Sequence, residues 1–248
     1  MTPAARRASP QTARAAAVSQ EQARSFLRMA AHELRTPLNS ILGFSEILAR
    51  ELYGPLGAPQ YREYAGIIHE SGQRLLKLVN QVMEIARLES GSIDWDLRAE
   101  ALDQAVEDVV ATFGQEIGAR RLAIEISPAK TLPRVTADPR GLRTVLSGLI
   151  HNAVVFSPEG STVRISAVGG RATVDLAIEN EAEKIDPAEL ARLMKPFVQG
   201  QSAPTRATEG AGLGLPICAL TCRAMGGRLI LSNPTGRRLR ATVQLPTA

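Results

Sequence analysis

The residues of this 248-residue chain best suited to chemistry lie close together near its beginning. His32 is followed directly by the carboxylate Glu33 and, one helical turn later, by the hydroxyl of Thr36, with Pro37 beside it. Residues three and four apart are neighbours on a helix, so a helix here would gather these side chains on one exposed shoulder. An imidazole with an acid or base next to it can act as a nucleophile. A surface histidine without a chemical role is the alternative that its position alone leaves open.

The apolar pattern around His32 predicts the helix that must position it. From Leu27 to Leu52, mostly apolar residues recur at alternating spacings of four and three, which is typical of a helix in a coiled-coil-like bundle. His32 lies one residue off this seam and is expected to face water. The segment from Tyr64 to Ile85 repeats the pattern, and two glycines and two prolines between Tyr53 and Gln60 forbid a continuous helix. We therefore expect an α-helical hairpin that pairs with a second copy, as a homodimer, into a four-helix bundle.

Length and composition indicate two domains and exclude several classes of protein. The hydrophobic content of 44% is ordinary for a globular protein. No stretch approaches the roughly 18 apolar residues of a membrane span, and the N-terminus lacks the apolar core of a secretory signal, so we expect a cytoplasmic protein. The net charge of +4 comes from scattered arginines without interleaved aromatic residues, so no nucleic-acid partner is predicted. Residues 1–19 are basic and are expected to be disordered.

Beyond Gly91 the pattern changes from long helices to short alternating elements. Residues 101–117 and 138–155 are helix-like, and further helices are expected near Pro187 and from Gly212. The strand-like segments are 122–127, 162–168, 172–179, 227–232 and 240–245. This order predicts an α/β sandwich with helices on one face of a mixed sheet.

Two runs in this second domain could bind a nucleotide. Glycines 210, 212 and 214 come before or at the start of a predicted helix, where free backbone N–H groups can cradle a phosphate. A flexible loop that caps a helix is the alternative. Asn152 is a polar residue in an otherwise apolar helix, and its amide oxygen could ligate a Mg²⁺ ion bound mainly through nucleotide phosphates. A helix-surface asparagine is the alternative there.

Together these runs resemble the sequence boxes of two-component sensor histidine kinases. The segment from His32 to Asn39 resembles the H box, and the segment from His151 to Gly160 resembles the N box. Residues 195–199 resemble the F box, and residues 210–215 resemble the G2 box. The resemblance covers residues 20–246 in the family's order. Residues 51–72 are further similar to the cell-cycle sensor kinases of alphaproteobacteria.

The resemblance implies a division of labour between two domains. Residues 20–91 would form the dimerisation and histidine-phosphotransfer domain, and residues 95–246 an ATP-binding domain of the Bergerat (GHKL-type) fold. His32 would be the phosphoacceptor, attacking the γ-phosphate of ATP as a neutral imidazole, with Glu33 as its acid or base. Thr36 would orient a water that dephosphorylates the partner. That partner is the receiver domain of a response regulator, and the input signal would come from a separate sensor or regulatory protein, or from a longer parent chain.

The resemblance also assigns ATP and Mg²⁺ as cofactors. The nucleotide-binding positions that it implies are Asn152, Asn180, Ala182, Phe197, Gly210, Gly212, Leu213, Gly214 and Leu215, with Asn152 also as the metal ligand.

The chain departs from the family at the G1 box, whose usual pattern is Asp-x-Gly-x-Gly. Its three signature positions fall on Asn180, Ala182 and Lys184. Asn180 can still accept a hydrogen bond from an adenine amino group, but without the strength that a charge gives. Two Cβ atoms also replace glycine hydrogens beside the base. Two functions therefore stay open: an ATP-dependent histidine kinase, and an ATP-impaired pseudokinase that acts as a response-regulator phosphatase, phosphotransferase or scaffold.

Overall fold

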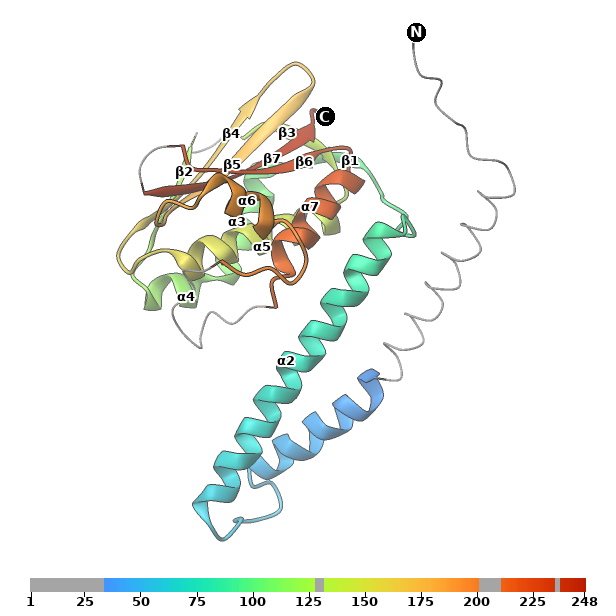
Figure 1. Cartoon of the computed structure of the whole chain (residues 1–248), viewed down its shortest axis with the longest axis vertical. Coiled ribbons are helices and arrows are strands. Elements are labelled where there is room, and N and C mark those ends of the chain that lie inside the picture. The colour runs from blue at the N-terminus through green and yellow to red at the C-terminus, as the bar shows by residue number, and fades with distance from the viewer. Residues whose placement is uncertain (1–33, 128–131, 201–210, 235–236) are drawn as a thin grey trace, which may run out of the picture. The chain divides into compact units, whose positions relative to one another are not determined.

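A computed structural model describes residues 34–127, 132–200, 211–234 and 237–248 (Figure 1). His32, Glu33, Gly210 and the basic segment 1–19 lie outside these residues. Contacts divide the chain into two compact units, Met1–Ser90 and Gly91–Ala248. Within the described ranges, every helix is too short or too polar to cross a membrane.

The first unit is an antiparallel helical hairpin, as the apolar pattern predicts. One helix covers residues 34–49, turns occupy the region up to residue 58, and α2 (Pro59–Glu89) runs back along it. Pro59 stands in the first turn of α2, where its missing N–H would have no helical partner in any case. After α2 the chain turns at Gly91, whose φ of 61° lies in the left-handed region that favours glycine.

Only part of the predicted seam is used inside one hairpin. Leu38 and Ser45 are 5% and 3% exposed, and a Cβ added at Gly72 would lie 3.0 Å from Leu42 Cδ2, so the two helices approach closely there. The Ser45 hydroxyl donates to the Leu42 carbonyl at 3.0 Å, which satisfies a polar group in this contact. Seven apolar seam residues are at least 45% exposed; they are Leu34, Ile41, Leu48 and Leu52, with Tyr64, Ile68 and Leu75 on α2.

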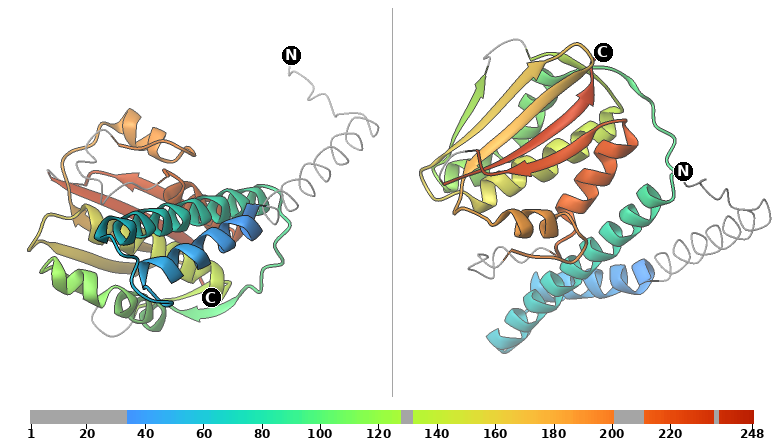
Figure 2. Two further views of the ribbon diagram at one scale, coloured as in Figure 1. Left: turned by 90° about the horizontal axis from the view of Figure 1, so that it is seen from below. Right: turned by 45° about the horizontal axis from the view of Figure 1, so that its top comes forward.

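The second unit is a mixed sheet covered by helices on one face (Figure 2). The strand order is β2-β4-β5-β7-β6, in which β2 and β4 are parallel and every other pair is antiparallel. The strands are β2 (Ala123–Ser127), β4 (Thr162–Gly169), β5 (Thr173–Glu181), β6 (Arg228–Ser232) and β7 (Arg238–Pro246). The helices are α3 (Leu102–Thr112), α4 (Gly114–Ala119), α5 (Pro139–Phe156), α6 (Pro187–Leu193) and α7 (Gly214–Ala224). The predicted α/β sandwich is confirmed.

The core lies between the sheet and the helical layer. Along β4 and β5 buried residues alternate with more exposed ones, because successive side chains of a strand point to opposite faces. In α7, Cys218 and Cys222 are free thiols that are 1% and 0% exposed, so both pack as core residues.

Two details of the second unit differ from the sequence prediction. A separate two-stranded sheet of β1 (Arg98–Ala101) and β3 (Arg134–Ala137) was not predicted. Each strand has four residues, too few for a clear alternation. The helix expected over 101–117 is broken at Phe113, whose φ of −102° and ψ of 11° leave the helical region.

Candidate functional site

Part of the motif around His32 is described on the first helix of the hairpin. Thr36 lies on its exposed surface, two residues before the buried Leu38. Beside it, the Arg35 guanidinium donates to Asn80 Oδ1 of α2 at 2.7 Å. This bond links the described part of the motif to α2. His32 and Glu33 precede the described residues, so their roles remain predictions.

Asn152 lies in the last turns of α5, where it is half-buried between the buried residues Ile150 and Ala153. Four residues earlier, a Cβ at Gly148 would lie 2.6 Å from Cys218 Sγ, so α5 and α7 are in very close contact at this point. At the other end of α5, a Cβ at Gly141 would lie 2.9 Å from Met225 Sδ. The two helices therefore run antiparallel, and the end of α5 that carries Asn152 lies next to the start of α7.

The start of α7 is joined to the predicted F box by a tight backbone contact. The Phe197 N–H donates to the Gly212 carbonyl at 3.1 Å, and a Cβ at Gly212 would lie 2.6 Å from the Val198 carbonyl oxygen. Gly212 also has a φ of 69°, so only glycine fits there without strain. Of the residues that follow, Leu213 is 1% exposed, Gly214 is the first residue of α7, and Leu215 packs against the core.

Phe197 itself has a strained backbone. Its φ of 62° lies in the left-handed region, which costs a residue with a Cβ about 1–2 kcal/mol. The residue is nevertheless 65% exposed, so this backbone conformation does not bury Phe197 in the core. Strain of this kind clusters at binding sites, where the surrounding structure holds it in place.

Asn180 lies at the end of β5 and faces the helical layer. It is 5% exposed and shares one face of the strand with the buried residues Leu176 and Ile178. Its Nδ2 donates to the Glu181 carbonyl at 3.0 Å, and the Oδ1 of the same amide can act only as an acceptor. An acceptor at this position fits the amino group of an adenine base.

The segment after β5 is where the family's G1 box usually has glycines. It forms hydrogen bonds with residues that the sequence analysis did not identify. The Ala182 N–H donates to the Arg237 carbonyl at 3.0 Å, and Asn233 Nδ2 donates to the Ile185 carbonyl at 2.6 Å. Ala182 is half-buried and Lys184 is exposed. Asn233 and Arg237 both belong to the connection between β6 and β7, far away in sequence. The sequence predicts a turn there, but it does not indicate which segment the turn contacts.

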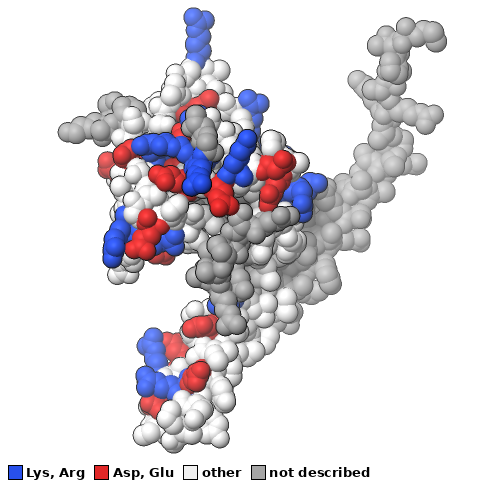
Figure 3. Space-filling view, turned by 60° about the vertical axis from the view of Figure 1, so that its left-hand side comes forward, with Lys and Arg blue, Asp and Glu red and all other residues white. Residues whose placement is uncertain are grey.

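The charges on the outer face of the sheet are arranged in opposite-sign pairs. Arg164 Nε donates to Glu125 Oε2 at 2.7 Å, and Arg240 Nε donates to Glu179 Oε1 at 2.8 Å. These four residues lie side by side on β2, β4, β5 and β7. Figure 3 likewise shows Lys and Arg interleaved with Asp and Glu on the face that it displays. Cross-strand pairs of this kind stabilise a sheet modestly and neutralise its surface.

Known protein families match both units. Residues 22–91 match the His Kinase A (phospho-acceptor) domain, and residues 137–248 match the family described as histidine kinase-, DNA gyrase B-, and HSP90-like ATPase. The chain is 34% identical over 241 residues to the non-motile and phage-resistance protein of Caulobacter vibrioides, which covers 95% of this chain and 28% of that protein. It is 31% identical over 234 residues to the cell-division control histidine kinase PdhS of Brucella abortus, covering 91% of this chain and 23% of that protein. The chain thus spans about a quarter of the length of these relatives.

Solved structures give the same picture. Full-length ShkA in complex with AMPPNP is similar with a TM-score of 0.77 and 30% identity, over 90% of this chain and 46% of that chain. The Acinetobacter baumannii histidine kinase AdeS shares the fold, with a TM-score of 0.62 and 24% identity over 87% of this chain and 98% of its own. Fold and site therefore define a phospho-acceptor helical hairpin followed by a GHKL-type ATPase domain. The chain belongs to the two-component sensor histidine kinases, and its sequence is similar to that of a kinase named for cell-division control.

Proposed function

We propose that this chain phosphorylates itself on His32 with ATP and passes the phosphoryl group to an aspartate of a response regulator. The observation that carries the proposal is the antiparallel pairing of α5 and α7. It packs Gly148, four residues before Asn152, against Cys218, four residues after the start of α7, in the domain that matches the ATPase family. His32 lies in the segment that matches the phospho-acceptor family.

The transfer at His32 is a substitution at phosphorus. The lone pair of one ring nitrogen of the neutral imidazole forms a bond to the γ-phosphorus, while the bond from that phosphorus to the β–γ bridging oxygen breaks and ADP leaves with its electrons. Glu33 accepts the hydrogen bond of the other ring nitrogen and stabilises the positive charge that develops there. In the second step a receiver aspartate oxygen attacks the phosphorus, and the imidazole recovers its electron pair. Thr36 orients the water that later hydrolyses the acyl phosphate.

The described pocket residues fit a purine nucleotide. The amide oxygen of Asn180 would accept from the base amino group, and the turn at Gly212 would let backbone N–H groups approach the phosphates. Asn152 would hold a Mg²⁺ ion, which when bound neutralises phosphate charge. Because the donor is ATP, we place the protein in the cytoplasm.

The hairpin would act as a homodimer. Its exposed stripe at Ile41, Leu48, Ile68 and Leu75 is too wide for one hairpin to cover, and a second copy presents the same stripe. The regulator's receiver domain and a separate sensor or regulatory protein complete the partners that we propose.

Labelling with γ-labelled ATP and Mg²⁺ tests the kinase. We expect acid-labile, alkali-stable label on the wild-type protein and none on His32→Ala, because a phosphorylated imidazole is stable in alkali and lost in acid. If the wild-type protein takes no label and millimolar ATP does not raise its melting temperature, the kinase proposal fails. The pseudokinase, which uses His32 without loading it from ATP, would then be the function to pursue.

A further inference from the structure

Trp95, the single tryptophan of the chain, is packed into the second unit only a few residues after α2 ends. It is partly buried against the main core cluster. A Cβ added at Gly141 would lie 2.7 Å from Trp95 Cζ3, 2.9 Å from Met225 Sδ and 3.4 Å from Thr221 Cγ2. The missing side chain at Gly141, in the first turn of α5, therefore leaves the space that the tryptophan ring fills.

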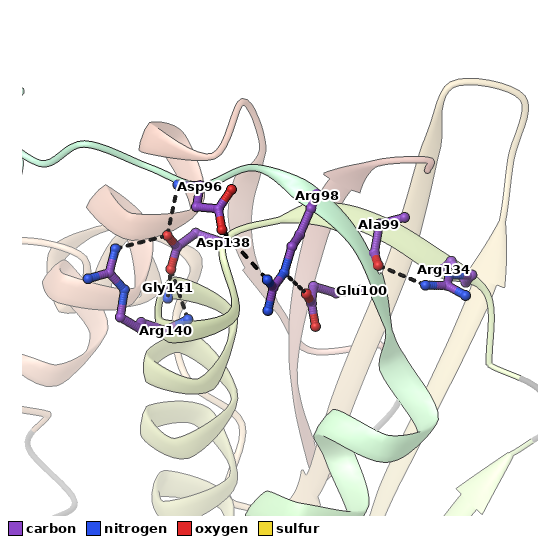
Figure 4. Close-up of polar contacts among 8 residues, drawn as sticks. All are labelled: Asp96, Arg98, Ala99, Glu100, Arg134, Asp138, Arg140 and Gly141. Carbon is purple, nitrogen blue, oxygen red and sulfur yellow. Dashed lines mark hydrogen bonds and ion pairs between the residues drawn. The ribbon is translucent and has the colours of Figure 1, made fainter.

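The residues after Trp95 are fixed by polar contacts (Figure 4). The Asp96 N–H donates to Asp138 Oδ2 at 3.0 Å, and the Asp138 side chain is fully buried. The strand β1 then pairs with β3, and the Arg134 guanidinium donates to the Ala99 carbonyl at 2.8 Å. We call Trp95, Asp96, Asp138 and Gly141 the entry anchor. Because of this anchor, the chain belongs rigidly to the second unit from residue 95 onward.

The anchor leaves a short tether between the two units. The helix α2 ends at Glu89, so residues 90–94 are the five that connect it to Trp95. Five extended residues span at most about 18 Å. A tether of only five residues is short, so adding a few residues to it changes its length by a large fraction.

We propose that Trp95 is a positioning residue for autophosphorylation. By fixing where the tether ends, its ring sets the effective concentration of the nucleotide domain at the phospho-acceptor motif. The inference rests on the proposed kinase function. Effective concentration falls roughly with the −3/2 power of tether length, so each added residue lowers it.

The test uses the full chain and two changes that lengthen the tether by different means. Trp95→Ala removes the ring that packs at Gly141 and leaves the Asp96–Asp138 bond as the remaining hold before β1, so it should loosen residues 95–97. A Gly-Ser-Gly-Ser insertion after Gly91 would lengthen the tether with the anchor intact. For each we expect an autophosphorylation rate at saturating ATP about twofold lower, with the Kd for a fluorescent nucleotide unchanged. Trp95→Phe should keep an aromatic ring packed at Gly141 and retain the wild-type autophosphorylation rate. Leu97→Ala is the matched control, because this neighbour is 45% exposed and lies outside the anchor.

Hydrogen exchange gives a readout that does not depend on activity. Peptides covering residues 95–97 should exchange about tenfold faster in Trp95→Ala than in the wild type, and at the wild-type rate in the insertion variant. The proposal is overturned if Trp95→Ala leaves this exchange unchanged, if it weakens nucleotide binding as much as it slows the reaction, or if the insertion does not lower the rate. A wild-type protein that takes no label refutes the kinase function instead, and exchange alone then decides whether the anchor exists.

Discussion

Asp138 shows how a single ionised side chain can hold the start of the second unit together. Burial alone would raise the pKa of this carboxyl, but the Arg140 guanidinium and the backbone N–H groups of Gly141, Asp96 and Arg140 all donate to it, and together they lower the pKa from 3.8 to about 2. A carboxyl with a depressed pKa stabilises the fold above its unfolded pKa and loses that contribution as the pH falls through its folded pKa. The shift corresponds to about 2 kcal/mol at neutral pH.

We therefore predict that Asp138→Asn lowers the free energy of unfolding at pH 7 by about 2 kcal/mol and flattens its decline between pH 4 and pH 2. The fluorescence of Trp95, the chain's single tryptophan, reports this unfolding because the ring lies in the same anchor. Glu107→Gln, which removes an exposed carboxylate on α3, should leave the pH profile unchanged. Identical profiles for Asp138→Asn and the wild type would refute the assignment.

Residue types alone singled out the reactive candidates but not the residues that support them. His32, Asn152 and the glycines were conspicuous because each is unusual in its local pattern. The partnership of Asp138 with Asp96 joins residues 42 apart in sequence, and such a contact exists only once the chain has folded.

Among the elements, the turn before α7 requires glycine at position 212 but not at position 214. Gly212 has a φ of 69° and no room for a Cβ beside Val198, whereas a Cβ added at Gly214 would meet no other atom within 4 Å. We expect Gly212→Ala to lower the free energy of unfolding by at least about 1–2 kcal/mol, from the left-handed backbone alone. Gly214→Ala should be neutral or stabilising, because alanine is the better helix former. Denaturant titration of the nucleotide-free proteins compares the two, and equal effects would contradict the close contact.

The long helices and the alternating strands were predictable because their apolar periodicity extends over many residues. The pair β1 and β3 was not, since each strand has only four residues and the uncharged residues of β1 are alanines, which give a weak apolar pattern. The region around Asn180 lies between these cases. Asn180 was identified through the resemblance to the G1 box, but the bond from Asn233 to the Ile185 carbonyl joins residues 48 apart in sequence.

At the scale of the whole molecule, the exposed stripe of the hairpin predicts its assembly. Ile68 on α2 is 49% exposed in a single chain, although its apolar side chain belongs to the repeating seam. Burying an isoleucine contributes about 1.5–3 kcal/mol, and a two-fold interface uses each residue twice. Ile68→Asp should therefore shift the assembly from a dimer toward the 26.6 kDa single chain.

Light scattering at several protein concentrations measures this change, and the melting temperature of the wild type should rise with concentration, as it does for a dimer linked to folding. Lys77→Glu is the control, because it introduces a carboxylate at an exposed position of α2 outside the seam. It should leave the mass at twice that of one chain. A monomeric wild type, or an Ile68→Asp protein that stays dimeric, would show that the stripe is covered by something other than a second copy.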